Sequence, residues 1–401
     1  MRMPCLDELI APPGTDDFLA SIYGRTFGVF SGDPQRFDKL FGWTDLNEIL
    51  ATQRLGESQL SLLVGEKMLH PSAYTTQEET KGIHWRRLWP QRVSTHLKAG
   101  ATLRLRELDQ MHRGIGELAA ALERELRERV SVNAYATSGA AQRSALHYDD
   151  HDVFVLQLDG TKWWRLYGRV EPLPLPDDVN YPTPKRAEPP AEPVAELRLN
   201  RGQVLYLPRG WWHRVQATDG ASLHLTVGVY RATGADLLNW LLGRLRDSDA
   251  LRTDIPRYEG EQAQREYLAR IRELVSAELA QPSVLARMLT DRDAGHRADL
   301  GFTLPVVAGD PGALPCGEPV RIQLLARRAV LEHDGAAVVL RAGGQTHRYA
   351  AHIAPMLQAL LAGHACSVSQ LADTGGASVP DGDVRTVAAS LIAAGLARLV
   401  P

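Results

Sequence analysis

The chain has 401 residues, with 45 Lys and Arg against 48 Asp and Glu, a formal net charge of −3 and three cysteines. This length suffices for two or three domains with cores of their own, and the near-balanced charge excludes nonspecific attraction to nucleic acid or anionic lipid as the main activity. Three cysteines far apart in the sequence exclude a disulfide framework and a structural zinc cluster, so we expect a cytoplasmic protein.

The first 110 residues are predicted to form short helices broken by Gly and Pro. An apolar helical pattern begins at Thr15, and Asp45 and Glu48 have capping-box spacing ahead of Ile49. The first residues lack the apolar core of a signal peptide, and no stretch approaches about 18 uninterrupted apolar residues, so we expect no membrane association.

Short β-type segments dominate residues 100–230. A single helix, predicted around 115–129, interrupts them. Strands at this density, separated by Gly and Pro, indicate a sandwich or a barrel rather than a βαβ sheet. The predicted strands are 101–105, 130–135, 153–158, 163–167, 203–207 and 223–229.

Eight of the 24 prolines lie between Pro172 and Pro193. Prolines at that density prevent ladder pairing and favour an extended, solvated loop. We interpret this segment as a surface insertion between two strands; a recognition motif for a proline-binding partner is the alternative.

Beyond Tyr230 the pattern turns helical. Thr233 and Asp236 form a capping box, and apolar residues between 267 and 275 form a stripe that needs a partner surface. From about Pro319 the order is strand, strand, helix 353–361, a helix start at Ser367, helix 384–394 and a closing strand, which resembles a winged helix. The predicted domains are therefore 1–231, a helical linker or dimerisation segment 232–300, and a winged-helix-like domain 301–401.

The strongest chemical signal is a pair of segments that carry histidine and aspartate. On a strand, residues i and i+2 share a face, so His147 and Asp149 present an imidazole and a carboxylate side by side. A strand that ends in Pro208-Arg-Gly210 delivers His213, 64 positions after Asp149, at the start of the next strand. Two His and one carboxylate leave three coordination sites open, as non-haem Fe(II) oxygenases require. Asp150 and His151 remain alternative ligands.

A buried cation is needed if the open sites bind 2-oxoglutarate, because the far carboxylate of this co-substrate requires a partner. Lys162, 15 positions after His147, lies at the head of a strand that we expect to pair along the His147 strand. Burying a lysine is costly without an anionic partner. An ordinary hairpin lysine with a solvated amine is the alternative interpretation.

The sequence resembles the bacterial cupin-like JmjC oxygenases, in the ribosomal-oxygenase branch of the 2-oxoglutarate/Fe(II)-dependent hydroxylases. The matching motifs are Asn133-Ala-Tyr135, His147-Tyr-Asp-Asp150, Phe154-Val-Leu-Gln157, Gly160-Thr-Lys162-Trp-Trp-Arg165, Gly202 through His213, and Ser222-Leu-His-Leu-Thr226. The resemblance implies an α+β fold with a double-stranded β-helix (JmjC/cupin jelly-roll) core, N-terminal helices, a helical dimerisation segment and a winged-helix-like C-terminal domain.

The resemblance also implies roles for individual residues. His147, Asp149 and His213 would be the iron ligands, and Lys162 would hold the distal carboxylate of 2-oxoglutarate. The co-substrate pocket would be lined by Asn133, Tyr135 and Thr226; His224 faces the same way as Thr226 on its strand. Some relatives have serine where this chain has Gly228, which puts one polar contact near the iron in question.

The implied activity is Fe(II)- and 2-oxoglutarate-dependent hydroxylation of a protein or peptide side chain, with an Arg or His of a ribosomal protein as the implied target. A peptide natural-product precursor and N-methyl demethylation are alternatives. An alternative that is not an enzyme is a ligand-sensing DNA-binding regulator. Residues 318–401 hold seven Arg, six acidic residues and no lysine, and this near-neutral charge disfavours DNA as a partner. The resemblance also implies a homodimer formed through the helical segment; packing of its apolar stripe on the barrel is the alternative.

Overall fold

The computed structural model describes residues 5–65, 67–139, 144–176, 178, 188, 191–218, 220–304, 312, 314, 321–374 and 377–400. Most of the proline-rich segment 172–193 therefore lies outside the described residues. The chain divides into two compact units, Met1–Arg231 and Ala232–Pro401. None of the helices in the described part of the chain combines the length and the apolar character that crossing a bilayer requires.

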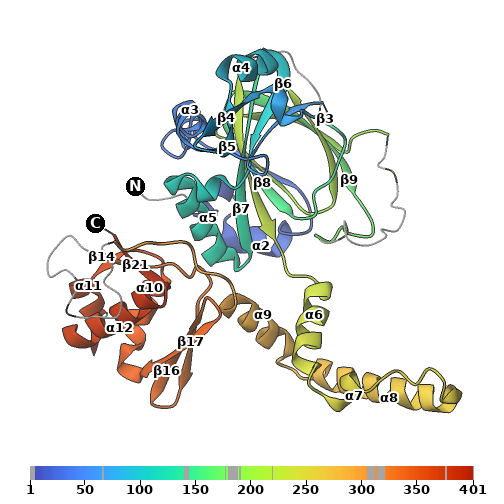
Figure 1. Ribbon diagram of the computed structural model, residues 1–401, viewed down its shortest axis with the longest axis vertical. Helices are drawn as coiled ribbons and strands as arrows, with labels where there is room; N and C mark the ends of the chain where they lie inside the picture. Colours follow the sequence, from blue (N-terminus) through green and yellow to red (C-terminus); the bar gives the residue numbers. More distant parts are fainter. Residues whose placement is uncertain are drawn as a thin grey trace. The chain divides into compact units, whose positions relative to one another are not determined.

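Two antiparallel sheets form the centre of the first unit. The larger has eight strands in the order β1-β11-β8-β13-β7-β6-β2-β3, and the smaller has the order β10-β9-β12. In Figure 1 helix α5 lies along β7, whereas β9 curves on the opposite side of the barrel. The strands are β1 (Gly28–Phe30), β2 (Leu60–Val64), β3 (Lys67–Met68), β6 (Ala99–Leu105), β7 (Arg129–Gly139), β8 (Asp152–Asp159), β9 (Thr161–Arg169), β10 (Ala195–Asn200), β11 (Val204–Leu207), β12 (Trp211–Ala217) and β13 (Ser222–Tyr230).

Alternation along the central strands sorts their side chains between two faces. On β7 and β13 every second residue, from Val130 to Ala136 and from Leu223 to Val229, enters the main hydrophobic core. The residues between them face the smaller sheet. On β8 both faces are buried: Phe154, Leu156 and Leu158 join the main core, and Val153 and Val155 join a second core with residues of β9, β10 and β11. The inner face of β7 and β13 is thus left free for polar side chains.

Helices cover the outer face of the larger sheet, since the main core includes apolar residues of α1, α2, α3 and α5. Helix α5 has His112 at its N-cap, where the side chain accepts a hydrogen bond from the backbone N–H of Ile115. The helices of this unit are α1 (Leu6–Ile10), α2 (Thr15–Ser21), α3 (Trp43–Thr52), α4 (Pro90–Lys98) and α5 (Arg113–Leu126), with short 3₁₀ turns at Pro71–Ala73 and Leu108–Gln110.

The prediction that the first 110 residues are helical is wrong in part. Besides the predicted strand at 101–105, they contribute strands β1, β2 and β3 to the larger sheet, and β4 (Thr75–Thr80) pairs with β5 (Ile83–Leu88) as a hairpin. Lys81 and Gly82 form its two-residue loop with positive φ values of 52° and 77°, the conformation that such hairpins favour. The capping box is also shifted: α3 begins at Trp43, and Asp45 accepts the backbone N–H of Gly42 at 2.7 Å.

The six strands predicted between residues 100 and 230 are confirmed as β6, β7, β8, β9, β11 and β13. The predicted partner of Lys162's strand is wrong. Strand β9 pairs with β10 and with β12, the strand that carries His213, and Lys162 lies opposite Leu199 and Ala217. Strand β10 is an additional element that the sequence prediction did not include.

The second unit begins with four helices. They are α6 (Gly234–Leu245), α7 (Asp249–Arg252), α8 (Gly260–Leu279) and α9 (Val284–Ala294). The capping box of Thr233 and Asp236 is confirmed at the start of α6. Trp240 donates its indole N–H to Asp291 at 3.1 Å, which ties α6 to α9.

A separate hydrophobic core lies in the rest of this unit. Residues 321–400 contain two three-stranded sheets, β18-β14-β21 and β15-β16-β17, and a two-stranded sheet of β19 and β20. The order after residue 350 matches the prediction, but four strands rather than two precede α10. The elements are β14 (Arg321–Leu324), β15 (Val330–Asp334), β16 (Ala337–Ala342), β17 (Gln345–Ala350), α10 (Ala354–Leu361), β18 (Cys366–Ser367), α11 (Val368–Ala372), β19 (Asp373–Thr374), β20 (Ala377–Ser378), α12 (Asp381–Ala393) and β21 (Ala397–Val400), with a 3₁₀ turn at Ala351–Ile353.

Candidate metal centre

Three side chains converge beside the smaller sheet: His147 and Asp149 from the segment between β7 and β8, and His213 from β12. One nitrogen or oxygen atom of each lies within 4.8 Å of the others. The Nε2 atom of His213 is 3.7 Å from Oδ2 of Asp149, and the two imidazole centroids are 4.3 Å apart. Within the described residues, no other group of three or more His, Cys, Asp or Glu has this arrangement.

The segment that carries His147 and Asp149 is not a regular strand, so that part of the prediction is wrong. His147 forms a single antiparallel bridge with His213. The backbone N–H of His147 donates to the carbonyl of His213 at 3.1 Å, and the N–H of His213 donates back at 2.7 Å. Two residues after His147, the carbonyl of Asp149 accepts the backbone N–H of Gly210 at 2.9 Å. The bridge, rather than strand alternation, brings the two histidines together.

Both imidazoles are oriented by backbone carbonyls. Nδ1 of His147 lies 3.0 Å from the carbonyl oxygen of Ala145, and Nδ1 of His213 lies 2.9 Å from that of Trp211. A carbonyl only accepts, so each Nδ1 carries a proton and donates it, and each Nε2 is the nitrogen left to bind a ligand. Burial and the neighbouring His147 lower the pKa of His213 to about 4. A neutral imidazole is the form that binds a metal.

Lys162 is buried on the inner side of β9, with 3% of its surface exposed. Burial lowers its pKa to about 7. His224, on the inner face of β13, is also buried, and burial together with the charge of Lys162 holds the pKa of His224 well below its ordinary value. Among the described residues no acid pairs with this buried amine, which is the environment expected of a lysine whose carboxylate partner belongs to a ligand.

A row of polar side chains crosses the inner face of the larger sheet. Register places Arg104 opposite Tyr135, Tyr135 opposite His224, and His224 opposite Gln157. The Tyr135 and His224 rings stack with centroids 5.0 Å apart and an interplanar angle of 3°. Burial raises the pKa of Tyr135, while the hydrogen bond from Arg104 acts in the opposite direction. The predicted pocket residue Tyr135 therefore lies in a continuous polar row.

The other two predicted pocket residues lie in the next row. Asn133 of β7 is directly opposite Thr226 of β13. The side-chain oxygen of Asn133 accepts the backbone N–H of Glu107 at 3.2 Å, which leaves its amide N–H groups as donors. The structure thus brings Asn133, Tyr135 and Thr226 onto one face of the larger sheet.

Four buried polar atoms on this inner surface have no hydrogen-bond partner among the described residues. They are Oγ1 of Thr137, Oε1 of Gln157, Nε1 of Trp164 and Nδ1 of His224. Trp164 links the groups, since its ring centroid lies 5.6 Å from that of His213 and 6.1 Å from that of His224. Buried polar groups are normally satisfied. Unpaired donors and acceptors around a buried lysine fit a small polar acid as the missing partner.

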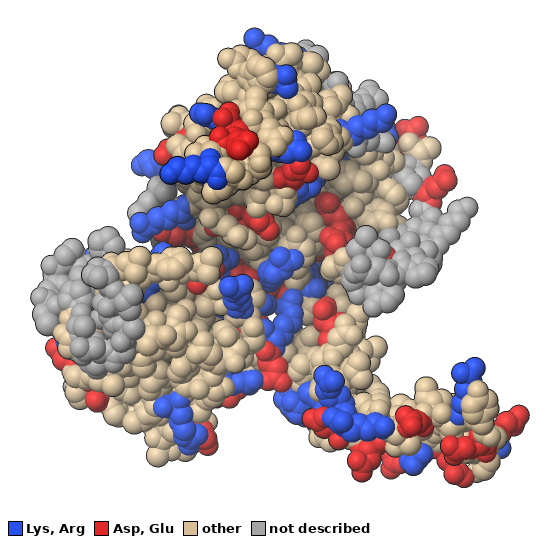
Figure 2. Space-filling model, in the orientation of Figure 1, with Lys and Arg blue, Asp and Glu red and all other residues tan. Residues whose placement is uncertain are grey.

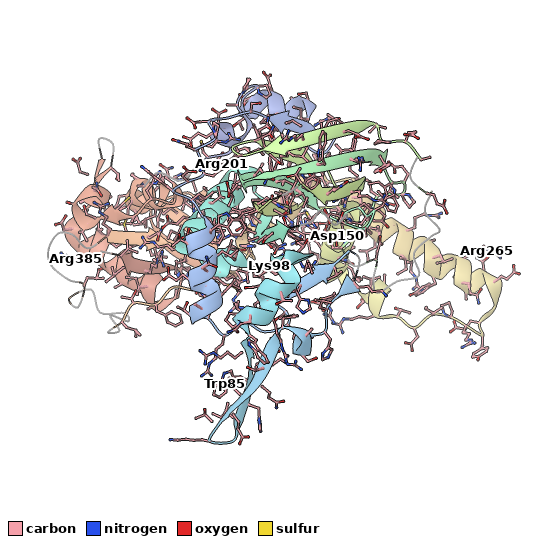
Figure 3. All side chains as sticks on the ribbon, turned by 90° about the horizontal axis from the view of Figure 1, so that it is seen from above. Trp85, Lys98, Asp150, Arg201, Arg265 and Arg385 are labelled. Carbon is pink, nitrogen blue, oxygen red and sulfur yellow. The ribbon has the colours of Figure 1, made fainter. Side chains whose placement is uncertain are left out.

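The alternative ligands do not join the group of three. Nδ1 of His151 is 2.6 Å from Oδ1 of Asp150, and the His151 ring stacks on Tyr230 at 4.5 Å. Figure 3 labels Asp150 among the strands of the first unit. Aromatic side chains beside the site pack on each other: Tyr148 contacts Trp212 edge to face, with ring centroids 4.6 Å apart.

Two residues of the site had no assigned role from the sequence. Arg104 lies within the predicted strand 101–105, but only the pairing of β6 with β7 places it beside Tyr135. Trp164 shares the inward face of β9 with Lys162, and both are buried. The alternation of buried and exposed residues along β9 could have predicted that Trp164 faces the same side as Lys162.

Residues 110–237 match the family model of the JmjC domain. Ribosomal oxygenase 1 of Homo sapiens is 32% identical over 241 residues, which cover 58% of this chain and 36% of that protein. The bifunctional lysine-specific demethylase and histidyl-hydroxylase NO66 of Dictyostelium discoideum is 37% identical over 166 residues, which cover 39% of this chain and 31% of that protein. The chain thus spans about a third of the length of these curated relatives.

A solved structure of YcfD, a ribosomal oxygenase from Escherichia coli, in complex with cobalt and 2-oxoglutarate, matches 96% of this chain and 98% of its own, with a TM-score of 0.58 and 17% identity. At this identity the match shows the fold alone. Together these findings confirm the JmjC/cupin fold and the resemblance to the ribosomal-oxygenase branch of the JmjC oxygenases.

Proposed function

We propose that this chain, which carries a JmjC domain at residues 110–237, is an Fe(II)- and 2-oxoglutarate-dependent hydroxylase of a protein side chain. The observation that carries the proposal is the convergence of His147, Asp149 and His213 with both Nδ1 atoms anchored to carbonyls. Two imidazoles and one carboxylate with open positions are the ligand set of non-haem Fe(II) oxygenases.

The residues present fit the metal and the co-substrate. His147, Asp149 and His213 would hold Fe(II). The buried amine of Lys162 would hold the distal carboxylate of 2-oxoglutarate, and Asn133, Tyr135 and Thr226 would line the rest of its pocket. When bound, Fe(II) and 2-oxoglutarate supply the activation of O₂ that hydroxylation of a carbon requires.

This chain's own contribution is orientation and exclusion of water. The Ala145 and Trp211 carbonyls fix the imidazole rings with Nδ1 as the hydrogen-bond donor, so that Nε2 is the nitrogen available to a metal. The buried inner faces of β9 and β13 surround the co-substrate pocket with Trp164, Lys162 and His224, which are each at most 4% exposed. A dry pocket strengthens the attraction between the amine and a carboxylate.

The substrate proposed is a ribosomal protein, with Arg or His as the hydroxylated residue. The names of the relatives support this choice, since they include ribosomal oxygenases and a histidyl-hydroxylase. A peptide natural-product precursor would use the same metal centre. The name of one relative also includes lysine demethylation, which would release formaldehyde from a methylated substrate.

Mass spectrometry of ribosomal proteins tests the proposal. Incubation with Fe(II), 2-oxoglutarate and O₂ is expected to add about 16 Da to one ribosomal protein, since a hydroxylation inserts one oxygen atom, with succinate formed in equal amount. A matched reaction without 2-oxoglutarate is the control. Formaldehyde release without a 16 Da product would instead support demethylation. Absence of both, together with no 2-oxoglutarate turnover, contradicts the proposal.

A homodimer formed through residues 232–300 is part of the proposal. Helices α6, α8 and α9 expose large apolar side chains: Leu238 and Leu242 are 57% and 58% exposed, and Leu268 is 63% exposed. No residue of α8 is buried. On the face in Figure 2, acidic and basic side chains both lie along α8. Apolar side chains exposed in this number favour association with another surface.

We expect the change Leu238→Glu with Leu242→Glu to convert the dimer to a monomer, because two carboxylates would be buried in the interface. Sedimentation velocity at micromolar concentration measures the outcome. The control is Leu304→Glu, which alters an exposed leucine outside these helices. A monomeric native protein under these conditions would refute the dimer.

For residues 301–401 we propose a winged-helix-like domain that docks substrate rather than DNA. The last long helix, α12, carries Asp381 and Asp383 in its first turn and a single arginine, Arg385, whereas DNA readers place a helix in a basic patch. A salt-dependent mobility shift of duplex DNA by the full chain would overturn this choice. We also propose a cytoplasmic location, on the low cysteine content.

A further inference from the structure

The segment from His147 to His151 carries two of the proposed ligands without being part of a regular strand. Its first end is held by the bridge between His147 and His213, and its middle by the hydrogen bond from Gly210 to the carbonyl of Asp149. Beyond Asp149 the backbone pairs again from Asp152, the first residue of β8, so Asp150 and His151 lie between two anchored points. The position of the Asp149 carboxylate therefore depends on what fixes the two residues that follow it.

The His151 side chain provides that anchor. Its Nδ1 is 2.6 Å from Oδ1 of Asp150. Its ring stacks on Tyr230 of β13, with centroids 4.5 Å apart and an interplanar angle of 21°. Since a carboxylate oxygen only accepts, Nδ1 donates and the ring orientation is set. Only 17% of the His151 side chain is exposed.

Gly228 of β13 makes room for this ring. A Cβ atom at position 228 would lie 2.7 Å from Cδ2 and 2.9 Å from Nε2 of His151, closer than real Cβ contacts. The φ angle of Gly228 is not positive, so its backbone conformation does not require glycine. A glycine inside a strand whose conformation any residue can adopt marks a close approach of another group. Here the approaching group is the imidazole of His151.

We propose that His151, seated on Gly228, is a positioning residue for Asp149. The proposal rests on the metal centre proposed above. A side chain at position 228 would push the ring away from β13, and the Asp150–His151 backbone with it, so that the Asp149 carboxylate would leave its place 3.7 Å from Nε2 of His213. Groups that orient metal ligands without touching the metal commonly change metal affinity by about 10- to 100-fold.

A double-mutant cycle on the full-length chain tests the inference with Co(II) as the probe. Visible absorption of bound Co(II) gives both its affinity and the geometry of its ligands, independently of turnover. Gly228→Ala is expected to weaken Co(II) binding about tenfold and to alter the absorption bands. His151→Val is expected to weaken binding similarly, because valine removes the ring that donates a hydrogen bond to Asp150 and stacks on Tyr230.

The decisive variant combines both changes. With the ring gone, the added methyl group at position 228 has no clash, so Gly228→Ala should have no further effect in the His151→Val background. Gly382→Ala is the matched control, since a Cβ there meets no atom within 4 Å, and it should bind Co(II) as the native chain does. Circular dichroism and the unfolding midpoint of each variant separate a local shift from misfolding.

Two results would overturn the inference while leaving the metal centre intact. One is native Co(II) affinity and spectrum in Gly228→Ala; the other is full additivity of the two changes in the double variant. If the native chain itself does not bind Co(II), the proposed function fails and the inference fails with it. These outcomes are distinguishable because the native titration is read first.

Discussion

Replacing Asp149 by alanine is expected to remove both metal binding and turnover. The side chain supplies the only carboxylate of the group of three described residues, and its Oδ2 lies 3.7 Å from Nε2 of His213. Changing a group that merely orients a ligand already costs about 10- to 100-fold, so loss of the ligand itself should lower metal affinity and turnover by more than about a hundredfold. Titration with Co(II) and the rate of succinate formation measure the two effects.

The control for this change is Asp254→Ala, an exposed aspartate of the second unit. It loses the same carboxylate and should retain native affinity and turnover. His147 and His213 keep their carbonyl partners in the Asp149 variant, so its unfolding midpoint should stay near that of the native chain. Retention of native 2-oxoglutarate turnover in Asp149→Ala would remove the proposed ligand set.

Strand alternation allowed much of the barrel to be predicted. Residues 130–135 and 223–229 alternate apolar and polar side chains, and the structure places the apolar set in the main core and the polar set toward the smaller sheet. The β4–β5 hairpin escaped prediction because its strands expose polar residues on both faces, such as the consecutive residues Arg86 and Arg87 of β5. Without a buried face there is no period-two signal.

The sequence indicated which residues form the site but not how they are arranged. His147, Asp149 and His213 were singled out by residue type and spacing, yet the strand that this reasoning assumed does not exist. Hydrogen bonds between segments about 60 residues apart place them, and such long-range contacts leave no local pattern. The same limit applies to Arg104, whose neighbour Tyr135 is set by the register of β6 on β7.

Replacing Lys162 by methionine is expected to weaken 2-oxoglutarate binding and at the same time to stabilise the free protein. Methionine is one atom shorter than lysine, so it keeps most of the buried chain and removes the charge. Removing one partner of a buried charge pair costs about 2–5 kcal/mol, and thus raises the KM for 2-oxoglutarate about 30-fold or more. In the free protein no acid of the described part of the chain pairs with this buried amine, so its replacement by an apolar group removes a cost.

The pH dependence follows from the lowered pKa of Lys162, about 7 in the folded chain against an ordinary 10.5. Between these two values the unfolded chain binds the proton and the folded chain does not, so this residue makes the free protein more stable as pH rises from about 7 to 10.5. Binding of 2-oxoglutarate has the opposite sign. Above pH 7 the amine must first take up a proton, so affinity should fall as pH rises.

Lys162→Met should abolish both slopes, whereas Lys98→Met, at an exposed lysine labelled in Figure 3, should change neither. Urea unfolding at pH 7 and pH 9 measures the stability of each variant, and calorimetric titration at the same two pH values measures its affinity for 2-oxoglutarate. If Lys162 had a structural role, its replacement would lower the stability of the protein and leave the affinity for 2-oxoglutarate unchanged. If Lys162 instead serves to bind the co-substrate, its replacement should raise the stability of the free protein and lower the affinity for 2-oxoglutarate. The interaction that compensates for burying the amine then exists only in the complex.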